Sequence, residues 1–93
     1  MKLEWDLVDR ILAFRVKLVL ELAKRGEISL DEYLQMVDQH ARDQREADLI
    51  RVSSRDLIEI TDDNRVKLSR DGYILLQSLM LEQMRKQMVS NIH

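Results

Sequence analysis

Residues 56–72 read DLIEITDDNRVKLSRDG, and this stretch decides the fold. Two short runs rich in aliphatic and β-branched residues, 57–60 and 65–68, flank the polar sequence TDDN, and each run alternates in part. Because Asp and Asn suit a tight turn between two strands, the pattern predicts a β-hairpin. The alternation places four side chains toward the core, Ile58, Ile60, Val66 and Leu68, and three toward solvent, Glu59, Arg65 and Lys67.

Upstream of the hairpin the chain has the pattern of helices. Residues 5–25 contain no helix breaker, and their apolar side chains cover more than half the circumference of a helix. Such a helix must bury two faces, one against its own domain and the other against a partner chain. Gly26 is a natural stop for this helix. Ser29 and Glu32 then have the spacing of a capping box, which begins a second helix.

Residues 30–52 allow two interpretations, because no Gly or Pro enforces a break. A turn at residues 38–40 would give a third helix from about residue 41 to residue 52. One continuous helix would also keep its apolar residues near one face. We favour the break. Downstream, Ser69 caps a last helix over residues 70–89, in which Met80, Met84 and Met88 recur every fourth residue along one side.

The segment from Asp56 to Leu79 resembles the wing of winged helix-turn-helix proteins such as MarR-like and PadR-like regulators. In that superfamily a Leu-Ile strand and an acidic turn precede a Val-x-Leu-Ser/Thr-x-x-Gly run and an apolar helix, and here that run is residues 66–72. Two departures are visible: Asp56 stands where a small residue or Gly is usual, and the turn before the third helix lacks its usual marker.

The resemblance implies a mainly α fold with a two-stranded β-hairpin wing, in a single domain over residues 1–93. It implies an N-terminal helix over residues 1–26, a helix-turn-helix over 29–55, the wing hairpin over 57–68 and a C-terminal dimerisation helix over 70–91. It also implies that the first and last helices form the dimer, and that the third helix and the wing contact DNA.

The orientation of the third helix decides the chemistry of its outer face. With Ala47 and Ile50 in the core, the outward residues are good readers of guanine and adenine in the major groove, namely Gln44, Arg45 and Arg51. With Leu49 and Val52 in the core instead, the outward residues suit a protein partner, namely Asp43, Glu46 and Ile50. Arg51 lies toward the outside in both orientations.

Charge bears on the same question, because Lys and Arg supply most DNA affinity by neutralising phosphates. Residues 26–40 carry four acids and no base, whereas residues 41–55 carry four bases and three acids. The hairpin turn is acidic. The candidate DNA-binding residues are Arg42, Gln44, Arg45, Arg51, Arg55, Arg65 and Lys67.

A homodimer is expected, because a 93-residue chain buries only a small core and both terminal helices carry surplus apolar surface. The candidate interface residues are Trp5, Leu12, Leu76, Met80, Met84 and Met88. We expect a small transcriptional regulator that binds double-stranded DNA, with the two third helices about 34 Å apart in successive major grooves. The alternative is a winged-helix module for protein–protein interaction or scaffolding that does not bind DNA.

Composition argues against other classes. The chain has no Cys, two His, two Gly and no Pro, so thiolate sites, His-rich metal cages and Gly-rich phosphate loops are excluded. No nucleophile, base and orienting group can be assembled, so neither an enzyme nor a cofactor is expected. The chain shows neither a secretory signal nor a membrane span, and a cytoplasmic location is expected.

Overall fold

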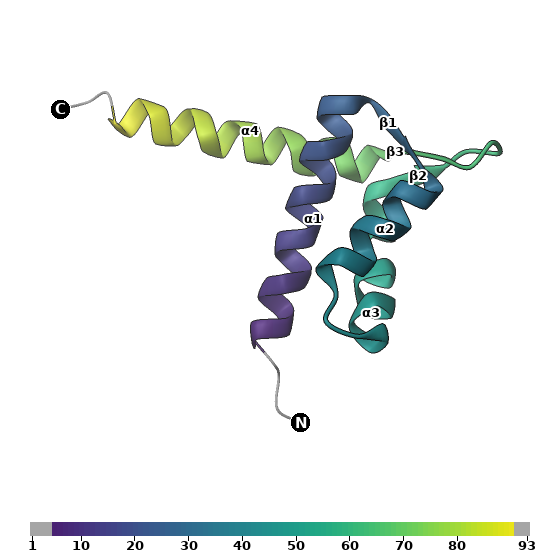
Figure 1. Ribbon diagram of the computed structural model, residues 1–93. Coiled ribbons are helices and arrows are strands. Elements are labelled where there is room, and N and C mark those ends of the chain that lie inside the picture. The colour runs from purple at the N-terminus through teal and green to yellow at the C-terminus, as the bar shows by residue number, and fades with distance from the viewer. Residues whose placement is uncertain (1–4, 91–93) are drawn as a thin grey trace.

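The computed structural model describes residues 5–90, which form four α-helices, a short 3-10 helix and a three-stranded sheet (Figure 1). In chain order the elements are α1 (Trp5–Arg25), β1 (Glu27–Ser29), α2 (Leu30–His40), α3 (Gln44–Ser54), η1 (Arg55–Leu57), β2 (Ile58–Ile60), β3 (Arg65–Leu68) and α4 (Arg70–Ser90). The chain is therefore mainly helical, as expected. The expected start at residue 1 and end at residue 91 lie outside the described residues.

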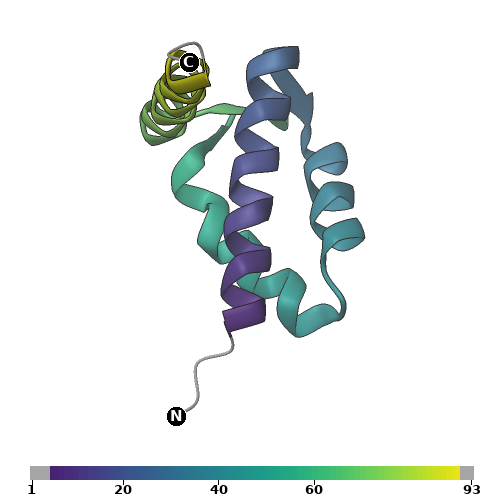
Figure 2. The same ribbon diagram turned by 90° about the vertical axis from the view of Figure 1, so that its left-hand side faces the viewer.

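The core lies between α1, α2, α3 and the sheet (Figure 2). Phe14 on α1 is fully buried, and its ring lies 6.5 Å from the ring of Tyr33 and 5.5 Å from that of His40, both on α2. Ile50 brings α3 onto the same cluster. Leu20 on the far side of α1 is half exposed. The broadly apolar first helix therefore buries one face within its own domain and leaves part of the other uncovered.

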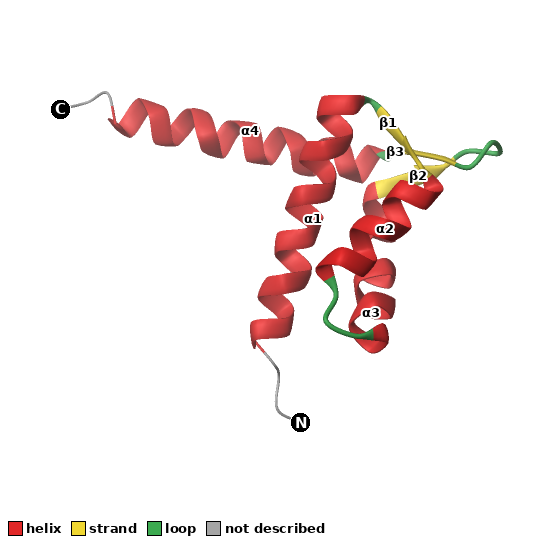
Figure 3. Ribbon diagram, viewed as in Figure 1, coloured by secondary structure: helices red, strands yellow, loops and turns green. Residues whose placement is uncertain are grey.

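The sheet has three strands, so the expected two-stranded hairpin was incomplete (Figure 3). The strand order is β1-β3-β2, and both pairings are antiparallel. Gly26 has a φ of +86°, which turns the chain back after α1 and brings Ile28 opposite Val66. Ile28 is fully buried there. A strand of three residues is too short to show a period-2 pattern, which is why the sequence did not reveal it.

The hairpin itself forms as predicted, with one correction. Ile58, Val66 and Leu68 are buried, but Ile60 is 52% exposed. Ile58 and Ile60 point to the same side of β2, because successive strand residues alternate. The helices cover that side at Ile58 and not at Ile60. The prediction that Ile60 faces the core was therefore wrong, because the helices that pack on this side of β2 do not extend as far as its last residue.

The break between the second and third helices is confirmed, and a continuous helix is contradicted. α2 ends at His40, and Ala41 is extended with a ψ of 143°. Asp43, also extended, caps α3 by accepting the backbone N–H of Glu46 at 2.9 Å. α3 thus begins about three residues later than expected. The Asp43-x-x-Glu46 spacing is a local signal for the start of α3 that the sequence analysis did not use.

The last helix is anchored at its beginning and projects at its end (Figures 1 and 2). Gly72 is buried against η1, where a Cβ atom would lie 2.3 Å from the carbonyl oxygen of Leu57. Leu75, Leu76 and Leu79 are half buried against the core. Beyond them every side chain described, from residue 80 to residue 89, is exposed.

Candidate nucleic-acid interface

α3 adopts the first of its two expected orientations. Ala47 and Ile50 are buried, whereas Leu49 and Val52 are 38% and 69% exposed. The orientation that would have put Leu49 and Val52 in the core is therefore wrong. The outer face carries Gln44, Arg45 and Arg51, together with Arg55 at the C-cap.

Asp48 occupies the middle of this outer face and engages two of the predicted DNA-reading residues. Gln44 donates from Nε2 to Oδ1 of Asp48 at 3.1 Å. Arg51 donates from Nη2 to the same oxygen. All three side chains lie at the surface, where such ion pairs are weak and exchange readily. Contact with a base edge would therefore replace the Asp48 interaction rather than break a buried network.

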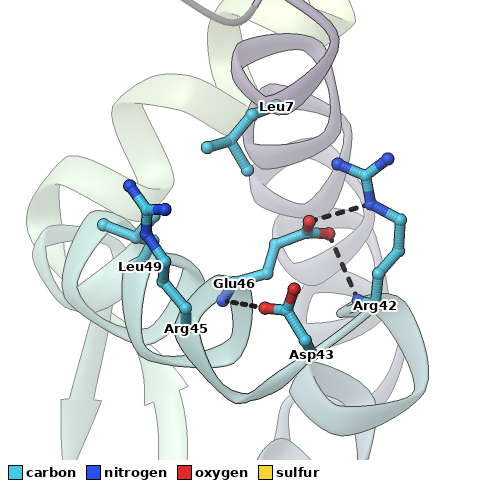
Figure 4. Close-up of a pocket in the computed structure, with 6 residues that line it drawn as sticks. All are labelled: Leu7, Arg42, Asp43, Arg45, Glu46 and Leu49. Carbon is cyan, nitrogen blue, oxygen red and sulfur yellow. Dashed lines mark hydrogen bonds and ion pairs between the residues drawn. The ribbon is translucent and has the colours of Figure 1, made fainter.

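Arg45 and Arg55 differ from the other candidates, because neither makes an ion pair with any residue in the described part of the chain. Both side chains are exposed. Arg45 extends beside Leu49 in a shallow pocket of about 310 Å³, which Leu7 of α1 also lines (Figure 4). Arg55 follows α3 directly and borders a second hollow. These two guanidinium groups carry uncompensated positive charge on the α3 surface.

Arg42 lies beside α1 and contacts carboxylates of its own chain (Figure 4). Its Nε donates to Glu46 at 2.9 Å, and its Nη1 donates to Asp6 at 3.1 Å. Glu46 is 5% exposed and also accepts from Arg10 Nε at 2.8 Å. Burial alone would raise the pKa of Glu46, but the hydrogen bonds from Arg10 and Arg42 lower it to about 2. The sequence analysis placed Glu46 outward only in the orientation of α3 that is wrong, and it did not predict this link to α1.

The hairpin residues predicted to contact phosphate are paired across strands. Arg65 donates from Nε to Glu27 at 3.1 Å, and Lys67 lies 3.8 Å from Glu59. The turn beyond them holds Asp62 and Asp63, and a hydrogen bond from Thr61 lowers the pKa of Asp63. The two cationic side chains of the sheet are therefore already paired with carboxylates, and they lie next to an acidic turn.

A groove of about 370 Å³ beside α3 was not predicted from the sequence. It runs between α2, α3 and β2, with Tyr33 at its buried end, where the hydroxyl contacts Ser54 Oγ at 2.7 Å. Its walls are mostly apolar and comprise Leu30, Leu34, Val52, Ile58 and Ile60. Asp48, Arg51 and Arg55 complete the lining. The signal available in the sequence was the pair of apolar residues Val52 and Ile60. The sequence analysis considered each one for a core-facing position in its own element and did not place the two side by side.

The predicted dimer residues are mostly exposed. Trp5 and Leu12 of α1 are 69% and 53% exposed, and the three methionines of the α4 stripe are more than half exposed. Leu76 is half buried against the core. The stripe lies on the projecting part of α4, whose other exposed apolar residues include Leu81 and Val89 (Figure 1).

Among residues 5–90, no group of three or more His, Cys, Asp or Glu side chains is placed to hold a metal ion. No described helix combines the length and the apolar character required to cross a bilayer. Comparisons of the chain with protein-family models, curated proteins and solved structures give no match.

Proposed function

We propose that the protein is a small winged-helix protein that binds double-stranded DNA as a homodimer and acts as a transcriptional regulator. In this proposal α3 is the recognition helix and the β2–β3 hairpin is the wing. Support comes from the order of elements and from the sheet order β1-β3-β2, with the helical pair α2 and α3 inserted between β1 and β2. A hairpin beside the second helix of such a pair is the arrangement that the resemblance implied.

The observation that carries the proposal is the outward face of α3. It presents Gln44, Arg45 and Arg51 along one helix, and Arg55 at its end. Arg pairs bidentately with guanine and Gln with adenine, and a single helix fits the major groove. Arg45 and Arg55 have no intramolecular ion pair within the described residues, so they are available to phosphate without breaking a contact.

A two-fold dimer supplies the second half of the interface. Met80, Met84 and Met88 on the projecting part of α4 are exposed to solvent, and a partner copy packed against them would remove them from water. Two α3 helices about one turn of DNA apart would double the number of arginines on one duplex. This doubling matters, because one chain has a formal net charge of −2 and attracts phosphate only locally.

The experiment measures binding to mixed 30-base-pair duplexes at low salt by fluorescence anisotropy. The double variant Arg45→Gln/Arg55→Gln should weaken binding at least tenfold, because charged hydrogen bonds are each worth about 1.5–3 kcal/mol. Arg85→Gln is a control for the loss of a surface cation, because Arg85 lies in the exposed C-terminal part of α4 and should leave binding unchanged. No binding by the parent protein at micromolar concentration would refute the proposal.

A second candidate function is a protein-binding module, and one observation favours it. Val52 and Ile60 are exposed beside α3, while Gln44 and Arg51 are engaged by Asp48. An interface built on those apolar residues would bury them against a protein partner. Its affinity would change little with salt, whereas DNA affinity falls steeply.

A further inference from the structure

We propose that the groove between α2, α3 and β2 binds a small molecule with an apolar body and a single carboxylate, and that Arg55 holds the carboxylate. The proposed ligand class is an amphipathic monoanion such as a medium-chain fatty acid.

The shape and lining of the groove match the apolar body of such a ligand. Its volume of about 370 Å³ lies at the lower end of the range for small-molecule sites, which is about 300–1,000 Å³. Leu30 and Leu34 line one wall from α2, and Ile58 and Ile60 line another from β2. Ile60 and Val52 are both more than half exposed. A ligand that covers them removes apolar surface from water.

The charge around the groove selects the sign of the head group. Arg51 is engaged by Asp48, so these two side chains offset each other. Arg55 has no such partner among the described residues, which leaves the lining with one uncompensated positive charge. Burial raises the pKa of Tyr33, and the guanidinium groups of Arg51 and Arg55 act in the opposite direction. Because Arg55 lines the groove, its guanidinium group favours a carboxylate there over an ammonium group.

Other ligand classes match the lining less well. A small inorganic anion would contact Arg55 but leave the exposed side chains of Val52 and Ile60 uncovered. A neutral apolar molecule would cover those side chains and gain nothing from Arg55. Only a ligand with both parts uses the whole surface, since small-molecule sites pair mostly apolar walls with a few placed polar groups.

A ligand in the groove should also affect DNA binding, and this part of the inference rests on the proposed function. Arg55 is one of the two arginines assigned to phosphate, so a bound carboxylate withdraws it from DNA. The ligand should therefore weaken DNA binding. Binding of the ligand itself does not depend on the protein being a DNA-binding protein.

The test is a titration of the ¹⁵N-labelled full chain with octanoate, followed by amide chemical shifts, with octanol as the neutral analogue. Octanoate should shift amides of α2, α3 and β2 and should bind at least tenfold more tightly than octanol. Arg55→Gln should weaken octanoate binding to the level of octanol, Arg55→Lys should retain part of the preference, and Arg85→Gln should change neither. A dispersed spectrum for each variant establishes that it is folded.

Equal affinity for octanoate and octanol would overturn the proposal, as would shifts confined to α4 or unchanged octanoate affinity in Arg55→Gln. The failure of the proposed function has a separate signature. Octanoate binding at the groove in a protein that does not retard DNA would support the ligand site and refute the DNA-binding role alone. Loss of DNA affinity on octanoate addition, abolished by Arg55→Gln, would support both.

Discussion

The Nε atom of Arg10 on α1 donates to Oε1 of Glu46 on α3 at 2.8 Å, and this contact joins two helices through residues that are 36 positions apart in the sequence. Glu46 is almost entirely buried, and its second oxygen accepts from Arg42 at 2.9 Å. Its backbone N–H is bound by the cap residue Asp43. The carboxylate therefore fixes the first turn of α3 against α1 and sets which face of α3 points outward.

The same carboxylate should make stability depend on acid pH. Its pKa falls from 4.5 to about 2 in the folded chain, so the ionised form stabilises the fold. That contribution is complete above about pH 4.5 and is lost as the pH falls toward 2. Glu46→Gln should therefore lower the melting temperature at pH 7 by several degrees, and should lower it progressively less as the pH falls through this window. Thermal unfolding followed by circular dichroism from pH 7 to pH 2 measures both effects.

The matched control for that series is Asp9→Asn, which removes an exposed α1 carboxylate with no ion pair in the described part of the chain. It should leave the pH profile close to that of the parent. Arg15 lowers the pKa of Asp56 by donating to its carboxylate at 2.7 and 3.1 Å. Because both variants keep this pair, each of them retains some acid sensitivity of the same sign. A constant difference between Glu46→Gln and the parent from pH 7 to pH 2 would contradict the role given to Glu46.

Gly72→Ala should destabilise the protein although alanine favours helices. The added Cβ would lie 2.3 Å from the backbone oxygen of Leu57 and 2.8 Å from Cδ2 of Leu68. The backbone oxygen cannot rotate away, so the overpacking cost of about 1–3 kcal/mol outweighs the helix preference of roughly 0.5–1 kcal/mol. Urea unfolding monitored by circular dichroism gives the free energy directly.

Gly26→Ala provides the comparison, because it tests backbone strain without a clash. Apart from its two chain neighbours, no described residue has an atom within 4 Å of the Cβ position at Gly26, but the φ of Gly26 is +86°. The substitution should cost about 1–2 kcal/mol from the left-handed conformation alone. A Gly72→Ala variant that is as stable as the parent would show that α4 is not anchored against η1 as described.

Met84→Glu should convert the proposed dimer to a monomer. Met84 is 56% exposed in the single chain, so the change should leave the fold intact while placing a charge in the α4 interface. Size-exclusion chromatography with light scattering measures the molar mass. Lys86→Glu places a negative charge on the same exposed stretch of α4, on the side of the helix away from the methionine stripe, and should preserve the dimer. A parent protein that is monomeric at 100 times the concentration used for DNA binding would remove the dimer from the proposal.

The order of elements was predictable because its signals are local. The Ser29 cap accepts from the N–H of Glu32 as the capping box requires, and Gly26 ends α1 in the left-handed region. The turn TDDN joins two strands, and Asn64 adopts a positive φ there. Each of these features depends on residues no more than four positions apart, so their pattern is visible in the sequence itself.

The contacts between distant segments were not predictable in the same way. β1 exists because Ile28 meets Val66, 38 positions later, and nothing within its three residues announces that pairing. A capping box would pair the Glu32 side chain with the cap residue Ser29, but the Glu32 carboxylate contacts Arg25 instead, and this hydrogen bond lowers its pKa. The groove likewise requires α2, α3 and β2 to meet, and no sequence period brings Leu34 beside Ile60.

The dependence of DNA affinity on salt tests the central claim most directly. The logarithm of the association constant should fall linearly with the logarithm of salt concentration, and each lost phosphate contact should flatten the slope by about 0.9. For the Arg45→Gln/Arg55→Gln double variant, the slope should be shallower than that of the parent by about 1.8 per chain in contact with DNA. A parent slope near zero, or identical slopes for the parent and the double variant, would contradict DNA binding through α3.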